Sequence, residues 1–219
     1  AQRPAVSQQG QEQPDGRDGP PREWKAHDSW HRLATVQNVC ARFRRANPDV
    51  SHLTAEELSE MMCSNSPPIL VDVRSEGEYR VSTIPGAIRL ADVHKNVTHG
   101  ATVVCFCTVG MRSSLEARML ARRHPNCTVY SMDGVLCWSH IGGSFHEPKT
   151  GTPTDKLHVF SRQFAQMLPE HSEPAAVWYS GRSVGMAGAV CDVAEKVVRS
   201  TFHRLFSRAW RYGQSPQSR

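Results

Sequence analysis

A cysteine and an arginine separated by four residues are the side chains of this sequence best suited to chemistry. Cys107 follows the apolar run 103–106, and Arg112 follows Gly110 in a short segment after it. The apolar run has the length and composition of a buried strand, and the residues after Arg112 show the spacing of a helix. A strand, a tight loop that opens with a Cys, and a helix start together form a place to hold an anion.

Such a loop should stabilise Cys107 as a thiolate. The unpaired N–H groups of the first helical turn point into the loop, and the helix dipole adds partial positive charge. A thiolate is the anion that these groups stabilise. Arg112 adds a permanent positive charge on a planar group with several donors. The sequence therefore predicts an activated cysteine nucleophile that faces an anionic substrate.

Strands and helices alternate through the middle of the chain. The pattern predicts strands at 50–53 (an edge strand), 69–73, 87–90, 102–106 and 128–131. It predicts helices at 30–46, after the capping-box residues Thr54–Glu57, at 76–79, at 112–123 and at 134–141. Such alternation indicates an α/β fold with a parallel sheet covered by helices on both faces. Ligands of such sheets bind beyond the carboxyl ends of the strands, where Cys107 is expected to lie.

Four short motifs follow one another in a fixed order. Residues 68–74 read P-I-L-V-D-V-R, 78–88 contain Glu-Tyr and then Ile-Pro-Gly-Ala-Ile, 107–113 read C-T-V-G-M-R-S, and 130–138 contain Asp-Gly and a closing Trp. In this order and spacing they resemble the rhodanese-homology family of single-domain sulfurtransferases over roughly residues 50–145. One departure is that Ser82 and Thr83 stand where the family usually has Gly-His, which bears on substrate preference and local packing rather than on sulfur chemistry.

The resemblance implies a rhodanese-like three-layer fold and a sulfurtransferase that carries sulfane sulfur as a persulfide on Cys107. The implied donor is a small anion such as thiosulfate, and the implied acceptor is a thiophilic small molecule, a thiol or a protein. The transfer in two stages implies ping-pong kinetics. The implied substrate-binding residues are those of the loop: Thr108, Val109, Gly110, Met111, Arg112 and Ser113. We expect Asp72 and Arg74 to form a supporting polar network that holds adjacent loops, and we expect no metal ion or cofactor.

Two other functions fit part of the pattern. Cysteine-dependent phosphatases and arsenate reductases also place a Cys and an Arg around an anion, but five residues separate the two in those families. The four residues found here make a smaller loop, which suits a sulfur atom better than a tetrahedral phosphate. The chain could instead be a non-catalytic docking module with the same fold, although the presence of Cys107, Gly110 and Arg112 argues against it.

Composition divides the chain into five parts. Residues 1–28, rich in Gln, Gly, Pro and Arg, are expected to be disordered, 29–145 to form the catalytic domain, 146–188 to be a connector with short elements, 189–212 to be a basic amphipathic helix, and 213–219 to be a frayed tail. Within the connector, residues 157–164 are expected to fold back on the domain.

The predicted helix 189–212 holds the basic character of the chain. Residues 181–219 contain seven Lys or Arg and two acids, so the whole net charge of +5 resides there. The apolar face of this helix packs on the domain or on another subunit, or it contacts an anionic membrane surface or a partner's groove. We favour packing, and we do not expect nucleic acid as a partner.

The seven cysteines are an odd number without the spacing of a disulfide framework or a zinc site. Cys105 lies within an apolar strand and is expected to be core, and packing roles are also expected for Cys63, Cys127, Cys137 and Cys191. Free buried cysteines favour a reducing compartment. No apolar run approaches the roughly 18 residues of a membrane span. We therefore expect a cytoplasmic protein, or an organellar one if a targeting segment has been removed.

Overall fold

The computed structural model describes residues 22–170 and 175–179. The predicted helix 189–212, the tail 213–219 and Cys191 lie outside these residues, as do most of the segment 1–28 and part of the connector.

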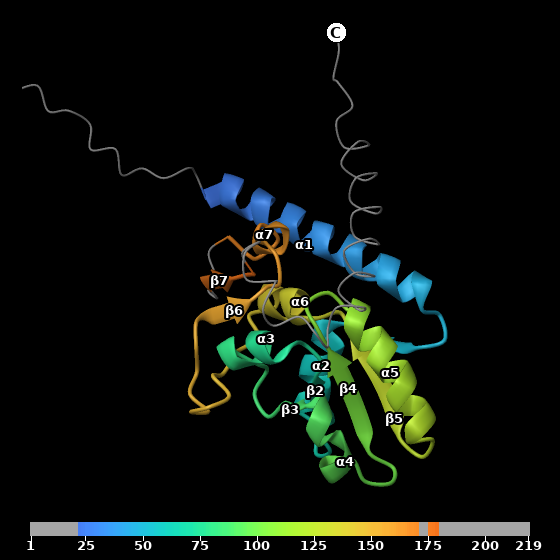
Figure 1. Cartoon of the computed structure of the whole chain (residues 1–219). Coiled ribbons are helices and arrows are strands. Elements are labelled where there is room, and N and C mark those ends of the chain that lie inside the picture. Colours follow the sequence, from blue (N-terminus) through green and yellow to red (C-terminus); the bar gives the residue numbers. More distant parts are fainter. Residues whose placement is uncertain (1–21, 171–174, 180–219) are drawn as a thin grey trace, which may run out of the picture.

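Five parallel strands form the centre of the structure (Figure 1). They are β1 (Ser51–Leu53), β2 (Ile69–Asp72), β3 (Ile88–Arg89), β4 (Thr102–Phe106) and β5 (Thr128–Met132), in the order β1-β5-β4-β2-β3. In register, Val103 of β4 lies opposite Ile69 of β2 and Val129 of β5. The predicted parallel sheet is therefore confirmed, with β1 as an edge strand.

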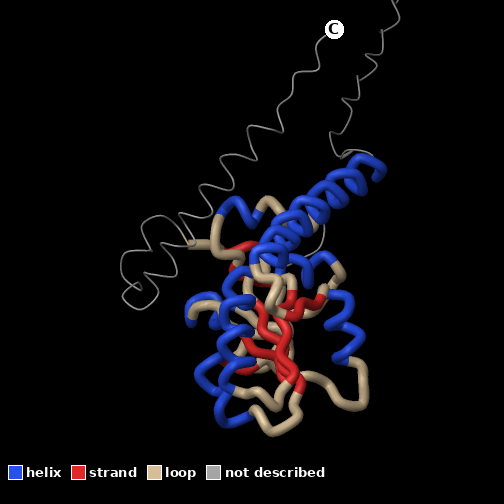
Figure 2. Tube along the Cα trace, turned by 90° about the vertical axis from the view of Figure 1, so that its right-hand side faces the viewer, coloured by secondary structure: helices blue, strands red, loops and turns tan. Residues whose placement is uncertain are grey.

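Helices cover both faces of this sheet (Figure 2). Helices α1 (Arg22–Ala46), α2 (Ala55–Met62) and α6 (Val135–His140) share one apolar cluster, and α4 (Val93–Asn96) and α5 (Met111–Arg123) share the other. The remaining helices are α3 (Glu76–Val81), the 3₁₀ turn η1 (Leu90–Asp92) and α7 (Arg162–Ala165). The α/β layering predicted from the sequence is confirmed. Within the described residues, no helix combines the length and the apolar character that a membrane span requires.

Strand β4 shows why the sheet is buried on both sides. Val104 and Phe106 pack in the cluster of α1, α2 and α6, whereas Val103 and Cys105 pack in the cluster of α5. Successive side chains of a strand point to opposite faces, so this apolar run needs a helix layer on each side. Burial raises the pKa of the Cys105 thiol. The prediction that Cys105 is a core residue is confirmed.

Local side-chain hydrogen bonds determine where α2 begins. Thr54 and Glu57 form the predicted capping box, in which the Thr54 hydroxyl accepts from the Glu57 N–H and the Glu57 carboxylate accepts from the Thr54 N–H. Helix α1 begins at Arg22, earlier than the periodicity predicted, and so overlaps the last residues of the segment 1–28. Most of these residues are charged or polar, so they extend the helix without adding apolar periodicity.

The segment after residue 145 returns to the domain, as predicted for 157–164. Strands β6 (Lys156–His158) and β7 (Ala175–Val177) pair in parallel, and Leu157, Phe164 and Leu168 join the cluster of α1, α2 and α6. The core thus extends past residue 145, where composition placed the end of the domain. The few apolar side chains of this segment are hidden among Gly, Pro and Thr residues, so composition alone marks it as a connector.

Candidate active site

The loop between β4 and α5 lies at the carboxyl ends of the strands. Its carbonyls at Cys107 and Thr108 accept hydrogen bonds from the N–H groups of Val135 (2.8 Å) and Leu136 (3.3 Å) in α6. Gly110 ends the loop with φ at +86°, a left-handed conformation that glycine adopts without strain. The first turn of α6 and Gly110 therefore fix the loop from two sides.

Gly134 explains how closely α6 can approach this loop. A Cβ at that position would lie 2.5 Å from the Thr108 carbonyl carbon and 2.6 Å from the Val109 nitrogen, and the Gly134 φ is +106°. A larger residue would push α6 away from the loop. The Gly of the fourth motif of the sequence thus has a structural reason.

Buried hydroxyl groups surround the Cys107 sulfur. The Cys107 side chain is 1% exposed, and the Ser113 hydroxyl donates to its Sγ at 3.5 Å. The Ser131 hydroxyl of β5 donates to Ser113 at 2.9 Å and lies 3.3 Å from the Ser114 hydroxyl. Ser114 in turn donates to the Gly110 carbonyl at 2.6 Å. This chain of hydroxyls directs one hydrogen-bond donor at the Cys107 sulfur.

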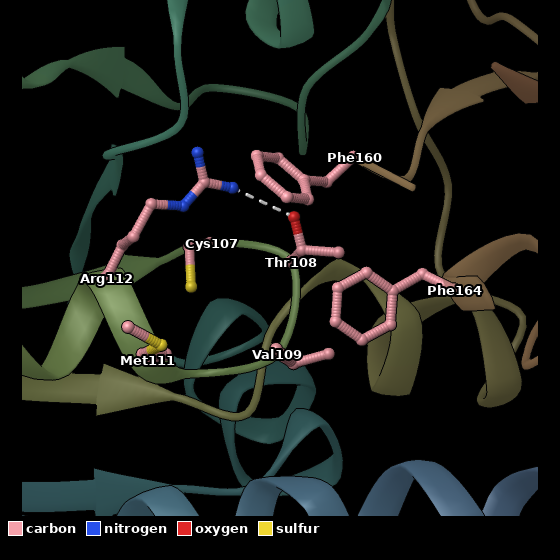
Figure 3. A pocket seen from close by; sticks show the side chains of 7 residues that line it. All are labelled: Cys107, Thr108, Val109, Met111, Arg112, Phe160 and Phe164. Atoms are coloured by element: carbon pink, nitrogen blue, oxygen red, sulfur yellow. Dashed lines mark hydrogen bonds between the residues drawn. The ribbon is translucent and has the colours of Figure 1, made fainter. Parts of the chain in front are cut away.

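Arg112 is held by a carboxylate. Its two terminal nitrogens donate to the two oxygens of Glu78 at 2.6 and 2.7 Å, and one of them donates to the Thr108 hydroxyl at 3.0 Å (Figure 3). Glu78 is fully buried and also closes a capping box with Ser75 at the start of α3. This fork-to-fork pair fixes the plane of the guanidinium. The charge of Arg112 is therefore balanced inside the protein rather than fully directed at the solvent.

The pKa values of this pair follow from its geometry. Burial alone would raise the pKa of Glu78, but the charge and hydrogen bonds of Arg112, with a further contribution from Arg74, outweigh burial and lower that pKa to about 2. Burial alone would lower the pKa of Arg112, but Glu78 reverses the effect and raises it. Both groups are thus ionised at neutral pH.

Asp72 and Arg74 form a second buried network. The Arg74 guanidinium donates through Nε and Nη2 to Asp72, with a shortest distance of 2.7 Å, and both side chains are inaccessible to solvent. Arg74 also donates to the Ser82 carbonyl, and the Thr83 hydroxyl donates to Asp72 at 2.8 Å. Of the two residues that stand at the place of the family's Gly-His, Thr83 supplies a side-chain partner for this network and Ser82 supplies its backbone carbonyl. Asp72 and Arg74 do not line the cavity at Cys107.

A cavity of about 20 Å³ opens beside the cysteine (Figure 3). Three loop residues, the first two residues of α5 and two phenylalanines line it: Cys107, Thr108, Val109, Met111, Arg112, Phe160 and Phe164. Gly110 and Ser113, also predicted to bind substrate, do not line it. The Arg112 guanidinium lies 5.3 Å from the centre of the Phe160 ring. Phe160 has a left-handed backbone with φ at +68°, and its N–H donates to His158 Nδ1 at 3.1 Å.

Sequence reasoning missed four residues of this site. Glu78 carries a signal, because Ser75 and Glu78 have capping-box spacing, but that signal predicts a helix start rather than a partner for Arg112. Phe160, Phe164 and Ser131 carry none, since only the fold brings them to the loop. Among the described residues, no three His, Cys, Asp or Glu side chains are grouped as a metal site would require.

Part of this chain is similar to a known family of protein domains. Residues 54–136 match the family model of the rhodanese-like domain. The chain contains a rhodanese-like domain. Within the chain, this match includes the loop from Cys107 to Ser113 and the start of α6.

A curated relative of this rhodanese-like domain is the tRNA sulfurtransferase of Desulfurococcus amylolyticus. It is 40% identical over 75 residues, which make up 34% of this chain and 15% of that protein. The chain therefore matches only a small part of that relative's length.

Two solved structures are also similar. The thiosulfate sulfurtransferase from Pseudomonas aeruginosa is 19% identical, with 66% of this chain and 29% of that chain covered and a TM-score of 0.42. The polysulfide-sulfur transferase from Wolinella succinogenes is 19% identical, with 47% and 82% covered and a TM-score of 0.39.

Proposed function

We propose that this chain is a sulfurtransferase that carries sulfane sulfur on Cys107. The observation that supports this most directly is the setting of the sulfur atom. Cys107 Sγ accepts a hydrogen bond from Ser113 and borders a cavity of about 20 Å³, which is room for about one water-sized group. A persulfide adds one atom to the cysteine, so the space suits that intermediate.

The proposed reaction has two stages. The Cys107 thiolate attacks the outer sulfur of thiosulfate, the sulfur–sulfur bond of the donor breaks, and sulfite leaves with the electron pair. A thiophilic acceptor, such as cyanide or a thiolate, then attacks the outer sulfur of the persulfide, and the Cys107 thiolate leaves. The Ser113 hydroxyl and the N-terminal dipole of α5 stabilise the negative charge in both stages.

Arg112 acts in this proposal mainly by shaping the loop. Both terminal nitrogens are bonded to Glu78, and one is also bonded to Thr108. The sequence-based expectation that Arg112 binds the donor anion stays a prediction. The charge of Arg112 still lies at the mouth of the cavity, where its side chain is 21% exposed.

The same contacts argue against a phosphatase. A phosphoryl group is bound by an arginine that offers both terminal nitrogens to its oxygens. Here Glu78 already accepts from both terminal nitrogens of Arg112, and the cavity of about 20 Å³ has room for the single outer sulfur of a donor but not for a whole tetrahedral anion. The four-residue spacing between Cys107 and Arg112 points the same way.

The donor is proposed to be a small anionic sulfur compound. Thiosulfate is the first to test, because a similar structure is named a thiosulfate sulfurtransferase, and inorganic polysulfide is the second, because another is named a polysulfide-sulfur transferase. The name of the curated relative also supports sulfur transfer as the reaction class.

Steady-state kinetics with thiosulfate or polysulfide as donor and cyanide as acceptor test the proposal. We expect parallel double-reciprocal lines, the pattern of ping-pong transfer, and activity that is lost in Cys107→Ala but kept in Cys105→Ala. Cys105 is the matched control because it is two residues away and equally buried. Comparable losses in both variants, or no turnover with either donor, would contradict the assignment.

A further inference from the structure

Two cysteines outside the proposed active site lie in contact. Cys40 of α1 and Cys137 of α6 are 97 residues apart in the sequence, yet their sulfur atoms are 3.8 Å apart. The two side chains are 1% and 5% exposed. Helix α1 crosses the domain beside α6 (Figure 1), so the pair joins the two elements.

A cavity gives access to one of the two thiols. It has a volume of about 280 Å³, and its walls combine polar and apolar side chains from α1, α2 and the start of α6. Cys137 lines this cavity and Cys40 does not. Such a space admits a small oxidant, so Cys137 is the thiol that it meets first.

Cys40 has the environment of a second, resolving thiol. Its Sγ lies against Cys137 Sγ and donates to the Asp133 carbonyl at 3.2 Å. The hydrogen bond with Cys137 and burial raise the pKa of Cys40. Cys40 is therefore protonated at neutral pH and does not line the cavity, so it is not the thiol that an oxidant attacks first.

We propose that Cys40 and Cys137 are an oxidisable pair that forms a disulfide with a hydroperoxide as oxidant. The peroxide transfers one oxygen to Cys137, giving a sulfenic acid and releasing water or an alcohol. The Cys40 sulfur then attacks the Cys137 sulfur, the sulfur–oxygen bond breaks, and the hydroxyl leaves as water with the Cys40 proton. The peroxide is reduced by two electrons, and the two thiols are oxidised by two electrons.

Only a small movement separates the two states. A disulfide bond is about 2.05 Å long, so the sulfur atoms must approach by about 1.8 Å. The bond would tie α1 to α6, the helix whose first N–H groups hold the carbonyls of Cys107 and Thr108. The modification site thus lies on the element that positions the proposed active-site loop.

Peptide mapping of the full chain tests this inference. The protein carries two substitutions. Cys107→Ser makes the result independent of sulfur transfer. Cys127→Ser is needed because Cys127 and Cys137 share the tryptic peptide 124–149. After hydrogen peroxide treatment and alkylation, we expect the peptides of Cys40 and Cys137 joined, lighter by two hydrogens and separated by dithiothreitol. With Cys40→Ser added, the link should vanish and dimedone should label Cys137.

The exposed Cys63 is the internal control for peroxide exposure. The inference is overturned if Cys63 becomes oxidised while Cys40 and Cys137 are both recovered as alkylated thiols after unfolding. It is also overturned if Cys137 links instead to another cysteine while Cys40 remains free.

Discussion

Removing the charge of Glu78 should destabilise the protein because Arg112 loses its buried counter-ion. In Glu78→Gln the side chain keeps its size and can still close the capping box with Ser75. The Arg112 guanidinium keeps its charge but faces a neutral amide. Breaking a buried ion pair from one side costs about 3–5 kcal/mol, and the partial exposure of Arg112 places the cost near the lower limit, about 3 kcal/mol.

The pKa of Glu78 leads to the same magnitude. It falls from an ordinary value of 4.5 to about 2 in the folded protein, and each pKa unit corresponds to about 1.4 kcal/mol. Because the folded pKa is depressed, the stabilisation is present above about pH 4.5 and is lost as the pH falls towards 2. The difference in unfolding free energy between wild type and Glu78→Gln should therefore be about 3 kcal/mol at neutral pH and should shrink through this window.

Urea denaturation of both proteins between pH 7 and pH 2.5 measures this difference. The matched control is Glu76→Gln, two residues earlier in the same helix, where the carboxylate is 56% exposed and pairs with the exposed Arg80. An exposed pair of this kind contributes about 0–1 kcal/mol. The reasoning is refuted if Glu78→Gln costs no more than Glu76→Gln, or if its cost does not change with pH.

Three further outcomes are expected. Arg112→Lys should lower the sulfur-transfer turnover at least tenfold, which corresponds to about 1.4 kcal/mol on the activation barrier. The reason is that Lys cannot bond Glu78 through a planar fork. Near-normal kinetics would show that a positive charge alone suffices. Phe160→Ala should raise kcat/KM several-fold for a bulky thiol acceptor relative to cyanide, because the Phe160 ring lines the small cavity and restricts access to it. Equal changes in kcat/KM for both acceptors would contradict this role of the ring. Burial raises the pKa of Asp133 to about 6 although the charge of Arg44 opposes this shift. Wild type should therefore lose stability relative to Asp133→Asn as the pH rises from about 4 to 6. Melting temperatures of the two proteins that change equally with pH across that window would contradict this prediction.

The sheet could be predicted from the sequence because its strands are apolar runs bounded by turn residues. The run 102–106 is buried on both faces, and a strand of that kind reads as a continuous apolar segment. The start of α2 was equally clear, because Thr54 and Glu57 satisfy each other's backbone groups locally. Structural features that depend on residues close together in the sequence could therefore be predicted.

The surroundings of Cys107 were harder to predict because they depend on contacts between residues far apart in the sequence. Glu78 is 34 residues from Arg112, and nothing in the intervening sequence indicates that the two meet. Phe160 and Phe164 reach the cavity only because the segment after residue 145 returns to the sheet. A polar, Gly- and Pro-containing segment gives no periodic signal of this return.

The helical extent of α1 was also underestimated. Most of its first residues are charged or polar, and helix propensity without apolar periodicity does not distinguish a helix from a polar linker. The contact of Cys40 with Cys137 depends on the docking of this helix, so it could not be inferred from cysteine spacing.

The mass of the Cys107 peptide after treatment with a sulfur donor tests the central proposal most directly. Purified protein is incubated with thiosulfate or polysulfide, separated from the donor, alkylated and digested under non-reducing conditions. Cys105 and Cys107 share the tryptic peptide 96–112, so fragmentation of that peptide assigns the added mass to one of them. The proposal predicts one additional sulfur atom on Cys107, none on Cys105, and loss of that sulfur as thiocyanate when cyanide is added before alkylation. An unmodified Cys107 with both donors, or an added sulfur that cyanide does not remove, would contradict it.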